Sequence, residues 1–131
     1  VMIGMFQKEV ALRIVSNCGT KDYGILSVLS QLMYHAKKCF DVAPESFSPP
    51  PKVMSSVVEL ILREDHLSPR EFELVRKLVR NAFQYRRKTL RNNLKSLIRD
   101  PLVLNDPYFD QRAEQLNPLE FLELSRKLWG A

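Results

Sequence analysis

Four prolines within eight residues, from Pro44 to Pro51, constrain the fold of this chain more than any other feature of its sequence. Proline fixes φ and has no amide hydrogen to donate, so this segment can form neither a helix nor a central strand. A short strand-like run at 38–42 precedes it, and a β-branched run at 53–62 follows it. The sequence therefore predicts a stiff loop that joins the two strands of an antiparallel hairpin.

The residues before this hairpin are typical of an α/β fold. Residues 1–6 are uniformly apolar and too few for an amphipathic helix, so we expect a buried strand. Helical spacing of apolar residues follows at 8–16 and at 26–34, with a loop between them. The order strand, helix, helix, strand, loop, strand predicts the end of a mainly parallel sheet, closed by the hairpin. We expect the first half of that sheet upstream of Val1.

Residues 66–131 predict a small all-helical domain. Ser68 and Pro69 combine a capping side chain with a proline at the first helical position, and apolar residues recur at helical spacing up to residue 83. A second helix is expected at 90–98, ending before Asp100-Pro101. A third begins at Asn117-Pro118 by the same capping logic. The fold class is therefore α/β followed by α.

Charge is distributed unevenly along the chain. Residues 1–65 hold seven basic and seven acidic side chains, whereas residues 66–131 hold thirteen basic and eight acidic ones and carry the whole formal charge of +5. Nine basic residues and no acidic one lie between Leu74 and Arg99. Unopposed cations repel one another, and an anionic partner relieves that repulsion. This segment therefore predicts a nucleic-acid-binding surface.

Within the basic segment, Arg87, Arg91 and Lys95 recur every four residues and predict one continuous stripe on a helix, with Arg80 within a turn of it. Such a stripe can follow a phosphate backbone, and Arg can bind phosphate through two parallel hydrogen bonds. Contact with the backbone gives affinity without sequence specificity. A solvated helix face is the alternative interpretation.

The proline-rich loop also presents an aromatic and a cation, Phe47 and Lys52. A stiff loop lowers the entropy lost when these side chains are held in place. An aromatic beside a cation suits stacking on an extruded base with the cation near its phosphate. Two alternatives remain open for this loop. Phe47 can pack beneath the loop as a plug, or the prolines can form a polyproline ligand for another protein.

Other chemistries find little support. No apolar run approaches the roughly 20 residues that a membrane span needs, so we expect no membrane partner. Cys18 and Cys39 do not form a Cys-x-x-Cys pair, and His35 and His66 are not spaced as metal ligands, so we expect no metal site. We expect the two thiols to be reduced and at least half-buried in a cytosolic protein.

Four stretches together resemble signature stretches of the KsgA-type rRNA adenine dimethyltransferases. They are MFQKEVA at 5–11, YGILSV at 23–28, FSPPPKVMS at 47–55 and RRKTL at 86–90. Their order and spacing are similar to those of the family across nearly the whole chain. Ile25 stands where many relatives have Arg, and Met54 where many have Asp. Each departure removes a charge near the expected active site and puts local salt bridges in doubt.

The resemblance implies a two-domain enzyme that uses S-adenosylmethionine to methylate N6 of two adjacent adenosines near the 3′ end of small-subunit rRNA. Residues 1–65 would be the C-terminal part of its Rossmann-like methyltransferase domain, and residues 66–131 its helical rRNA-binding domain. In relatives the aromatic of the proline-rich loop stacks on the flipped-out adenine, and this role falls here on Phe47. The resemblance adds Lys52, Arg86, Arg87 and Lys88 to the candidates for RNA contact.

The family's glycine-rich cofactor loop, acidic ribose-binding residue and Asn-Leu-Pro-Tyr-type motif lie upstream of these stretches, and none occurs in residues 1–131. We therefore expect no catalytic or cofactor-binding residue in this fragment and no activity from it alone. The full-length protein is expected to be a cytoplasmic monomer that acts on small-subunit rRNA in a pre-ribosomal subunit.

Three alternatives to this function remain. The chain can belong to an Erm-type enzyme, which methylates large-subunit rRNA, although the triple proline and the RRKTL stretch favour the small-subunit type. It can also be a non-catalytic RNA- or ribosome-binding module. A helical protein-interaction domain is the third alternative, and it predicts binding that is insensitive to salt.

Overall fold

The computed structural model of the chain describes residues 1–46 and 53–130. Three strands, β1 (Met2–Gln7), β2 (Tyr34–Val42) and β3 (Ser55–Leu62), form one sheet in the order β1-β3-β2. Both outer strands run antiparallel to β3. The predicted closing hairpin, β2–β3, is therefore present, with a bulge between Lys38 and Phe40. No parallel pair of neighbouring strands occurs in the described ranges.

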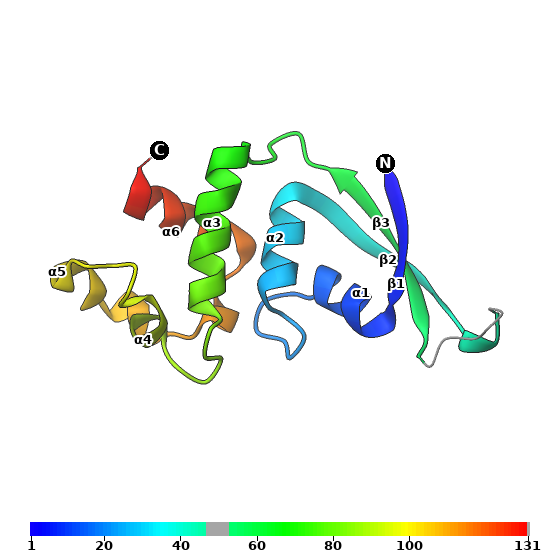
Figure 1. Ribbon diagram of the computed structural model, residues 1–131, viewed down its shortest axis with the longest axis horizontal. Coiled ribbons are helices and arrows are strands. Elements are labelled where there is room, and N and C mark those ends of the chain that lie inside the picture. Colours follow the sequence, from blue (N-terminus) through cyan, green and yellow to red (C-terminus); the bar gives the residue numbers. More distant parts are fainter. Residues whose placement is uncertain (47–52, 131) are drawn as a thin grey trace.

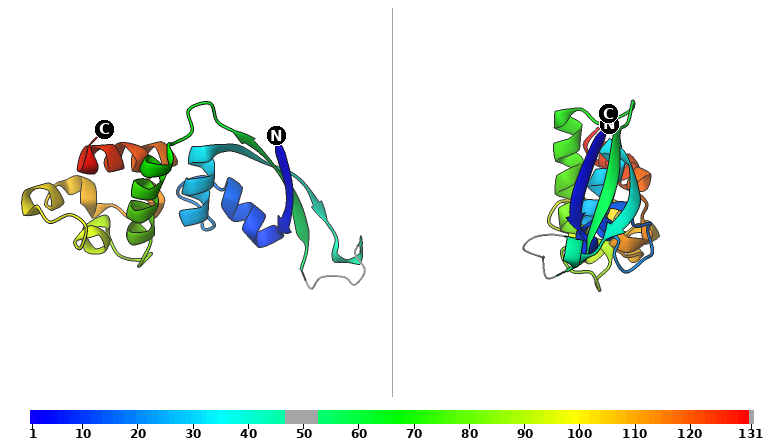
Figure 2. Two further views of the ribbon diagram at one scale, coloured as in Figure 1. Left: turned by 45° about the horizontal axis from the view of Figure 1, so that its top comes forward. Right: turned by 90° about the vertical axis from the view of Figure 1, so that its right-hand side faces the viewer.

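Two helices, α1 (Lys8–Val15) and α2 (Ile25–Met33), lie on one face of the sheet (Figure 2). Phe6 on β1 packs with Ala11, Ile14 and Val58 in a small core between α1 and this face. The prediction that residues 1–6 form a strand is confirmed, but the prediction that the strand is buried is wrong. Ile3 is 66% exposed, because β1 lies at the sheet edge and no described element covers the second face.

The helical part comprises α3 (Pro69–Ala82), α4 (Leu90–Leu94), α5 (Pro101–Leu104) and α6 (Pro118–Trp129), with short 3-10 turns at Pro44–Ser46 (η1), Pro107–Asp110 (η2) and Ala113–Gln115 (η3). Both predicted caps are confirmed. The Ser68 side chain accepts a hydrogen bond from the amide of Glu71, and that of Asn117 accepts one from the amide of Glu120. Each cap satisfies an amide that the first helical turn leaves without a backbone partner.

The helix predicted at 90–98 is shorter in the structure, and α5 begins at Pro101, where the sequence predicted only an end. Asp100 accepts a hydrogen bond from the amide of Leu102, and Pro101 occupies the first helical position. An Asp-Pro pair can stop one helix and cap the next, because proline lacks only an amide hydrogen that a first turn would not use.

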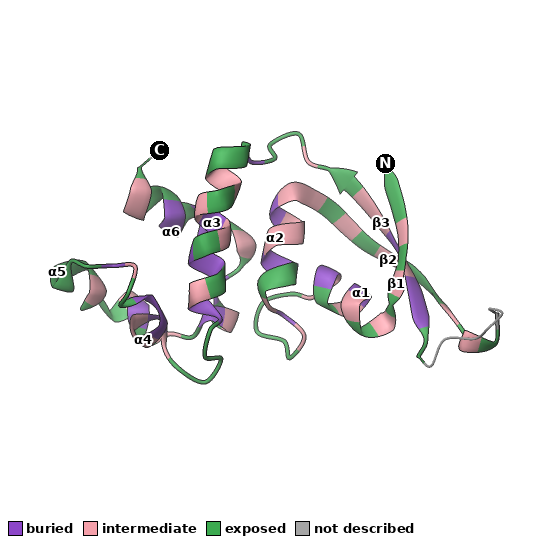
Figure 3. Ribbon diagram, in the orientation of Figure 1, coloured by how far each residue is buried: buried purple, intermediate pink, exposed green. Residues whose placement is uncertain are grey.

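The larger core crosses the predicted domain boundary at residue 65. Tyr23, Val28 and Leu32, from α2 and the loop before it, pack in the same buried cluster as Val75 of α3 and Phe121 of α6. Figure 3 marks buried residues on all three helices. Helix α2 therefore lies between the sheet and the helical part and belongs to the hydrophobic core of the latter.

Neither cysteine is buried. Cys18 lies in the loop between α1 and α2, Cys39 lies at the bulge of β2, and both side chains are exposed. The expectation of half-buried thiols is therefore wrong: one lies on a loop, and the other on the part of a strand where regular pairing is interrupted. Within residues 1–46 and 53–130, no helix is long and apolar enough to cross a bilayer.

Candidate nucleic-acid interface

The basic segment centres on a turn, residues 83–89, that joins α3 to α4. The buried side chain of Asn93 fixes this turn, because its amide nitrogen donates to the carbonyls of Ala82 at 2.8 Å and Tyr85 at 3.0 Å. Arg87 and Lys88 are exposed on the turn and form no ion pair with any described residue. Two cations are thus presented to solvent from backbone that the protein holds in place.

The predicted helical stripe of Arg87, Arg91 and Lys95 is wrong in its geometry. Helix α4 has only five residues, so Arg87 precedes it and Lys95 is its C-cap. The guanidinium of Arg91 donates to the carbonyls of Leu104 at 2.9 Å and Asp106 at 3.0 Å and also pairs with the carboxylate of Asp110. Arg91 therefore ties α4 to the segment after α5.

Arg86 is also engaged within the protein, since it donates to the carbonyls of Lys21 and Tyr23. Arg80 and Lys95 are exposed and have no ion pair within the described ranges. The structure thus divides the predicted RNA-contact residues into two groups. Arg80, Arg87, Lys88 and Lys95 point to solvent, whereas Arg86 and Arg91 have protein partners. The remaining two candidates, Phe47 and Lys52, lie outside the described residues.

A second polar cluster lies at the base of the proline-rich segment. Asp41 near the end of β2 accepts a hydrogen bond from Ser56 of β3 at 2.6 Å and pairs with Lys38 at 3.1 Å and Lys8 at 3.4 Å. The Ser56 hydroxyl, followed by Lys38 and Lys8, lowers the pKa of Asp41 to about 2. The amide of Lys8 also donates to the carbonyl of Met54 at 2.8 Å. These bonds join the first residue of α1 to β2 and to the residue that precedes β3.

The end of β1, the loop between α1 and α2 and the turn after α3 all lie along the lower edge of the molecule in Figure 1. The segments that resemble the family at 5–11, 23–28 and 86–90 therefore share one side of the molecule. The exposed cations Arg87 and Lys88 on this side are available to an extended polyanion, because phosphate contacts require exposed cations and not an enclosed pocket.

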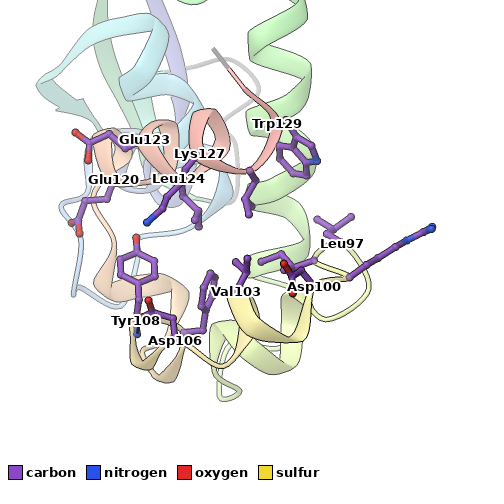
Figure 4. Close-up of a pocket in the computed structure, with 14 residues that line it drawn as sticks. Leu97, Asp100, Val103, Asp106, Tyr108, Glu120, Glu123, Leu124, Lys127 and Trp129 are labelled. Atoms are coloured by element: carbon purple, nitrogen blue, oxygen red, sulfur yellow. Dashed lines mark hydrogen bonds between the residues drawn. The ribbon is translucent and has the colours of Figure 1, made fainter.

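A hollow on the helical part has more acidic than basic side chains in its lining. It lies between α5 and α6 and is lined by apolar side chains, by the carboxylates of Asp100, Asp106, Glu120 and Glu123, and by the cations Arg99 and Lys127 (Figure 4). Burial raises the pKa of the Tyr108 hydroxyl, and Glu120 and Glu123 raise it further. Both effects disfavour the negatively charged form of the hydroxyl. Residues 100–125 contain six acidic residues and one basic residue. Carboxylates therefore outnumber cations in this part of the chain.

Sequence reasoning missed Asn93 and Glu114. A polar side chain is unfavourable in the middle of an apolar helical pattern unless it has a partner, and this was the available signal for Asn93. Glu114 had no such signal, because its carbonyl accepts a hydrogen bond from the amide of Gly19, at the other end of the sequence.

Comparison with known proteins identifies the family. Residues 1–111 match the family described as ribosomal RNA adenine dimethylase. Ribosomal RNA small subunit methyltransferase A of Flavobacterium johnsoniae is 48% identical over 125 residues, which cover 95% of this chain and 48% of that protein. The protein of the same name from Cytophaga hutchinsonii is 46% identical over 130 residues, which cover 98% of this chain and 50% of that protein. The chain thus spans about half the length of the curated relatives it matches.

Two solved structures share the fold. A dimethyladenosine transferase from Plasmodium falciparum is similar with a TM-score of 0.78 and 28% sequence identity, covering 95% of this chain and 56% of that one. The 23S rRNA methyltransferase ErmE is similar with a TM-score of 0.60 and 21% sequence identity, covering 96% of this chain and 53% of that one. At this identity the similarity is evidence of the fold alone. Both the predicted fold class and the resemblance to KsgA-type enzymes are confirmed. Because the family match includes most of its residues, the chain belongs to the ribosomal RNA adenine dimethylase family.

Proposed function

We propose that this chain is the C-terminal half of an S-adenosylmethionine-dependent enzyme that dimethylates N6 of two adjacent adenosines near the 3′ end of small-subunit rRNA. The match of residues 1–111 to the adenine dimethylase family carries this proposal. Two relatives that match nearly the whole chain are named as small-subunit methyltransferases, which supports the small-subunit substrate over the large-subunit one. The partner is then small-subunit rRNA in a pre-ribosomal subunit, and the protein acts as a cytoplasmic monomer.

The cofactor belongs to the other half of the protein. Methyltransferases of this kind bind S-adenosylmethionine with a glycine-rich loop, and the residues present do not fit that role. The four glycines of the chain are scattered, and Gly4 lies inside β1 and not in a turn after it. We assign residues 1–65 to the end of the methyltransferase domain and residues 66–131 to the rRNA-binding domain. The fragment alone is then inactive.

The contribution of this chain is to hold the RNA. Adenine N6 is a weak nucleophile because its lone pair is conjugated with the ring, so its methylation depends on positioning and on hydrogen bonds to the amino group. Phe47 is the candidate for stacking on the extruded adenine. Lys52 and the exposed cations Arg80, Arg87, Lys88 and Lys95 are the candidates for phosphate contact. These contacts orient the strand without selecting its sequence.

The experiment is methylation of purified small and large ribosomal subunits, each lacking its own adenine methylation, by the full-length protein and S-adenosylmethionine. Mass spectrometry of digested rRNA should detect N6,N6-dimethyladenosine at two adjacent positions of the small-subunit RNA only. Dimethylation of large-subunit RNA instead would support the Erm-type alternative. Salt-sensitive rRNA binding with no methyl transfer to either subunit would show a non-catalytic binding module.

A further inference from the structure

Arg86 lies in the exposed turn after α3, but its guanidinium contacts backbone far away in the sequence. The Nη2 atom donates to the carbonyl of Tyr23 at 2.6 Å and to that of Lys21 at 3.2 Å. The Cζ atom lies 5.7 Å from the centre of the Phe83 ring. The carboxylate of Glu114 lies 3.9 Å from Nη2. These partners hold the guanidinium against the loop that precedes α2.

Two further hydrogen bonds join the same loop to η3 and the residue after it. The amide of Gly19 donates to the carbonyl of Glu114 at 2.7 Å, and the buried hydroxyl of Tyr23 donates to the carbonyl of Leu116 at 2.6 Å. We call Gly19, Tyr23, Arg86, Glu114 and Leu116 the junction. It connects the loop between α1 and α2 with the turn after α3 and with η3.

We propose that Arg86 is a positioning residue. It fixes the phosphate-contacting turn, which carries Arg87 and Lys88, relative to residues 1–65, the part assigned to the methyltransferase domain. The inference rests on the proposed function, because that function assigns Arg87 and Lys88 to RNA. Arg86 itself does not contact RNA. Its hydrogen bonds anchor the turn to the loop after α1, and the first residue of α1, Lys8, is bonded to Met54 of the hairpin.

The chemistry of this contact favours arginine over lysine. One guanidinium nitrogen, Nη2, donates to both carbonyls, which are two residues apart in the loop, and the planar group lies over the Phe83 ring with Cζ 5.7 Å from its centre. An ammonium has no planar face to stack and concentrates its charge on one atom. Arg86→Lys should therefore keep the charge and lose part of the positioning.

The test uses the full-length protein with Arg86→Gln, Arg86→Lys and Arg87→Gln, and with Arg70→Gln on the first turn of α3 as a matched control. Arg87→Gln should lower the slope of log K for rRNA binding against log salt by roughly one unit, because one phosphate contact is lost. Arg86→Gln should leave that slope unchanged. It should instead lower kcat by about ten- to a hundredfold, because a displaced turn holds the adenosine out of line. The kcat of Arg86→Lys should lie between that of the unchanged protein and that of Arg86→Gln. The KM for S-adenosylmethionine should not change in either variant.

Two results would overturn the proposal. A salt slope that falls by roughly one unit in Arg86→Gln would make Arg86 a phosphate contact. A lower melting temperature with an unchanged kcat at 25 °C would make it a purely structural residue. If the unchanged protein transfers no methyl group, the proposed function fails, and hydrogen exchange then tests the junction separately. The amides of Gly19 and Tyr23 should exchange at least about tenfold faster in Arg86→Gln, and unchanged exchange would contradict the junction.

Discussion

Asn93 is a buried polar residue on α4, with 4% of its surface exposed. The carbonyls it binds, those of Ala82 and Tyr85, lie at the end of α3 and in the turn that follows. A helix end leaves a carbonyl such as that of Ala82 without a backbone partner, and leaving it buried and unpaired is costly. The carbonyl of Tyr85 also accepts a hydrogen bond from the amide of Lys88 at 3.0 Å. One side chain thereby replaces a conventional C-cap and fixes the backbone that carries Arg87 and Lys88.

Asn93→Ala should lower the free energy of unfolding by about 1–3 kcal/mol, because it removes both hydrogen bonds and leaves two carbonyls without these donors. Its neighbour Asn92 provides the control. The side chain of Asn92 is only partly buried and donates one long hydrogen bond, at 3.3 Å, to the side-chain oxygen of Asn93, so Asn92→Ala should cost no more than about 0.5 kcal/mol. Urea unfolding followed by circular dichroism measures both. Equal losses would show that the Asn93 bonds do not stabilise the turn.

At the scale of elements, the β2–β3 hairpin is joined to α1 through one carboxylate. Asp41 contacts Ser56 of β3, Lys38 of β2 and Lys8 of α1. Each partner stabilises the ionised carboxylate, the Ser56 hydroxyl most of all, and together they hold the pKa of Asp41 near 2. The ends of the two strands that flank the proline-rich segment are therefore linked by contacts that depend on charge.

This arrangement predicts a pH dependence. The folded-state pKa of Asp41, about 2, lies below its ordinary value of 3.8. The ionised group therefore contributes its full stability above pH 4, and this contribution is lost as the pH falls from about 4 through 2. Asp41→Asn should be less stable than the unchanged chain at pH 6, and the difference should disappear towards pH 2.

Denaturant unfolding at several pH values measures this difference. Asp22→Asn is the control, since Asp22 has no ion pair within residues 1–46 and 53–130. A difference for Asp41→Asn that stays constant between pH 6 and 2 would contradict the charge linkage.

At the scale of the whole molecule, the sheet and the helical part share α2. Its residue Val28 is fully buried, in the cluster that contains Leu78 of α3 and Phe121 of α6. The bonds of the junction join the same parts through polar contacts. Residues on either side of position 65 should therefore unfold together, because neither part can lose its structure without exposing the shared core.

Trp129, the only tryptophan of the chain, lies on α6 and reports on the helical part. Val28→Ala should lower the stability measured by Trp129 fluorescence and by far-UV circular dichroism equally, on the order of 2 kcal/mol for a buried truncation. Leu102→Ala, at a site 84% exposed, should leave both transitions in place. If the fluorescence transition does not move in Val28→Ala, residues 66–131 are an independent folding unit.

The sequence by itself determined the features that depend on nearby residues. These features are the helix starts at Ser68 and Asn117, the hairpin around the prolines and the four family stretches. Each is a pattern of neighbouring residues, and such patterns can be recognised in a single sequence. Only the tertiary structure decided which cations point to solvent, because the partners of Arg86 lie as far as 65 residues away. It also decided that β1 is an exposed edge and that α2 belongs to the helical core. Burial depends on what packs against an element, and periodicity shows only which side of the element is apolar.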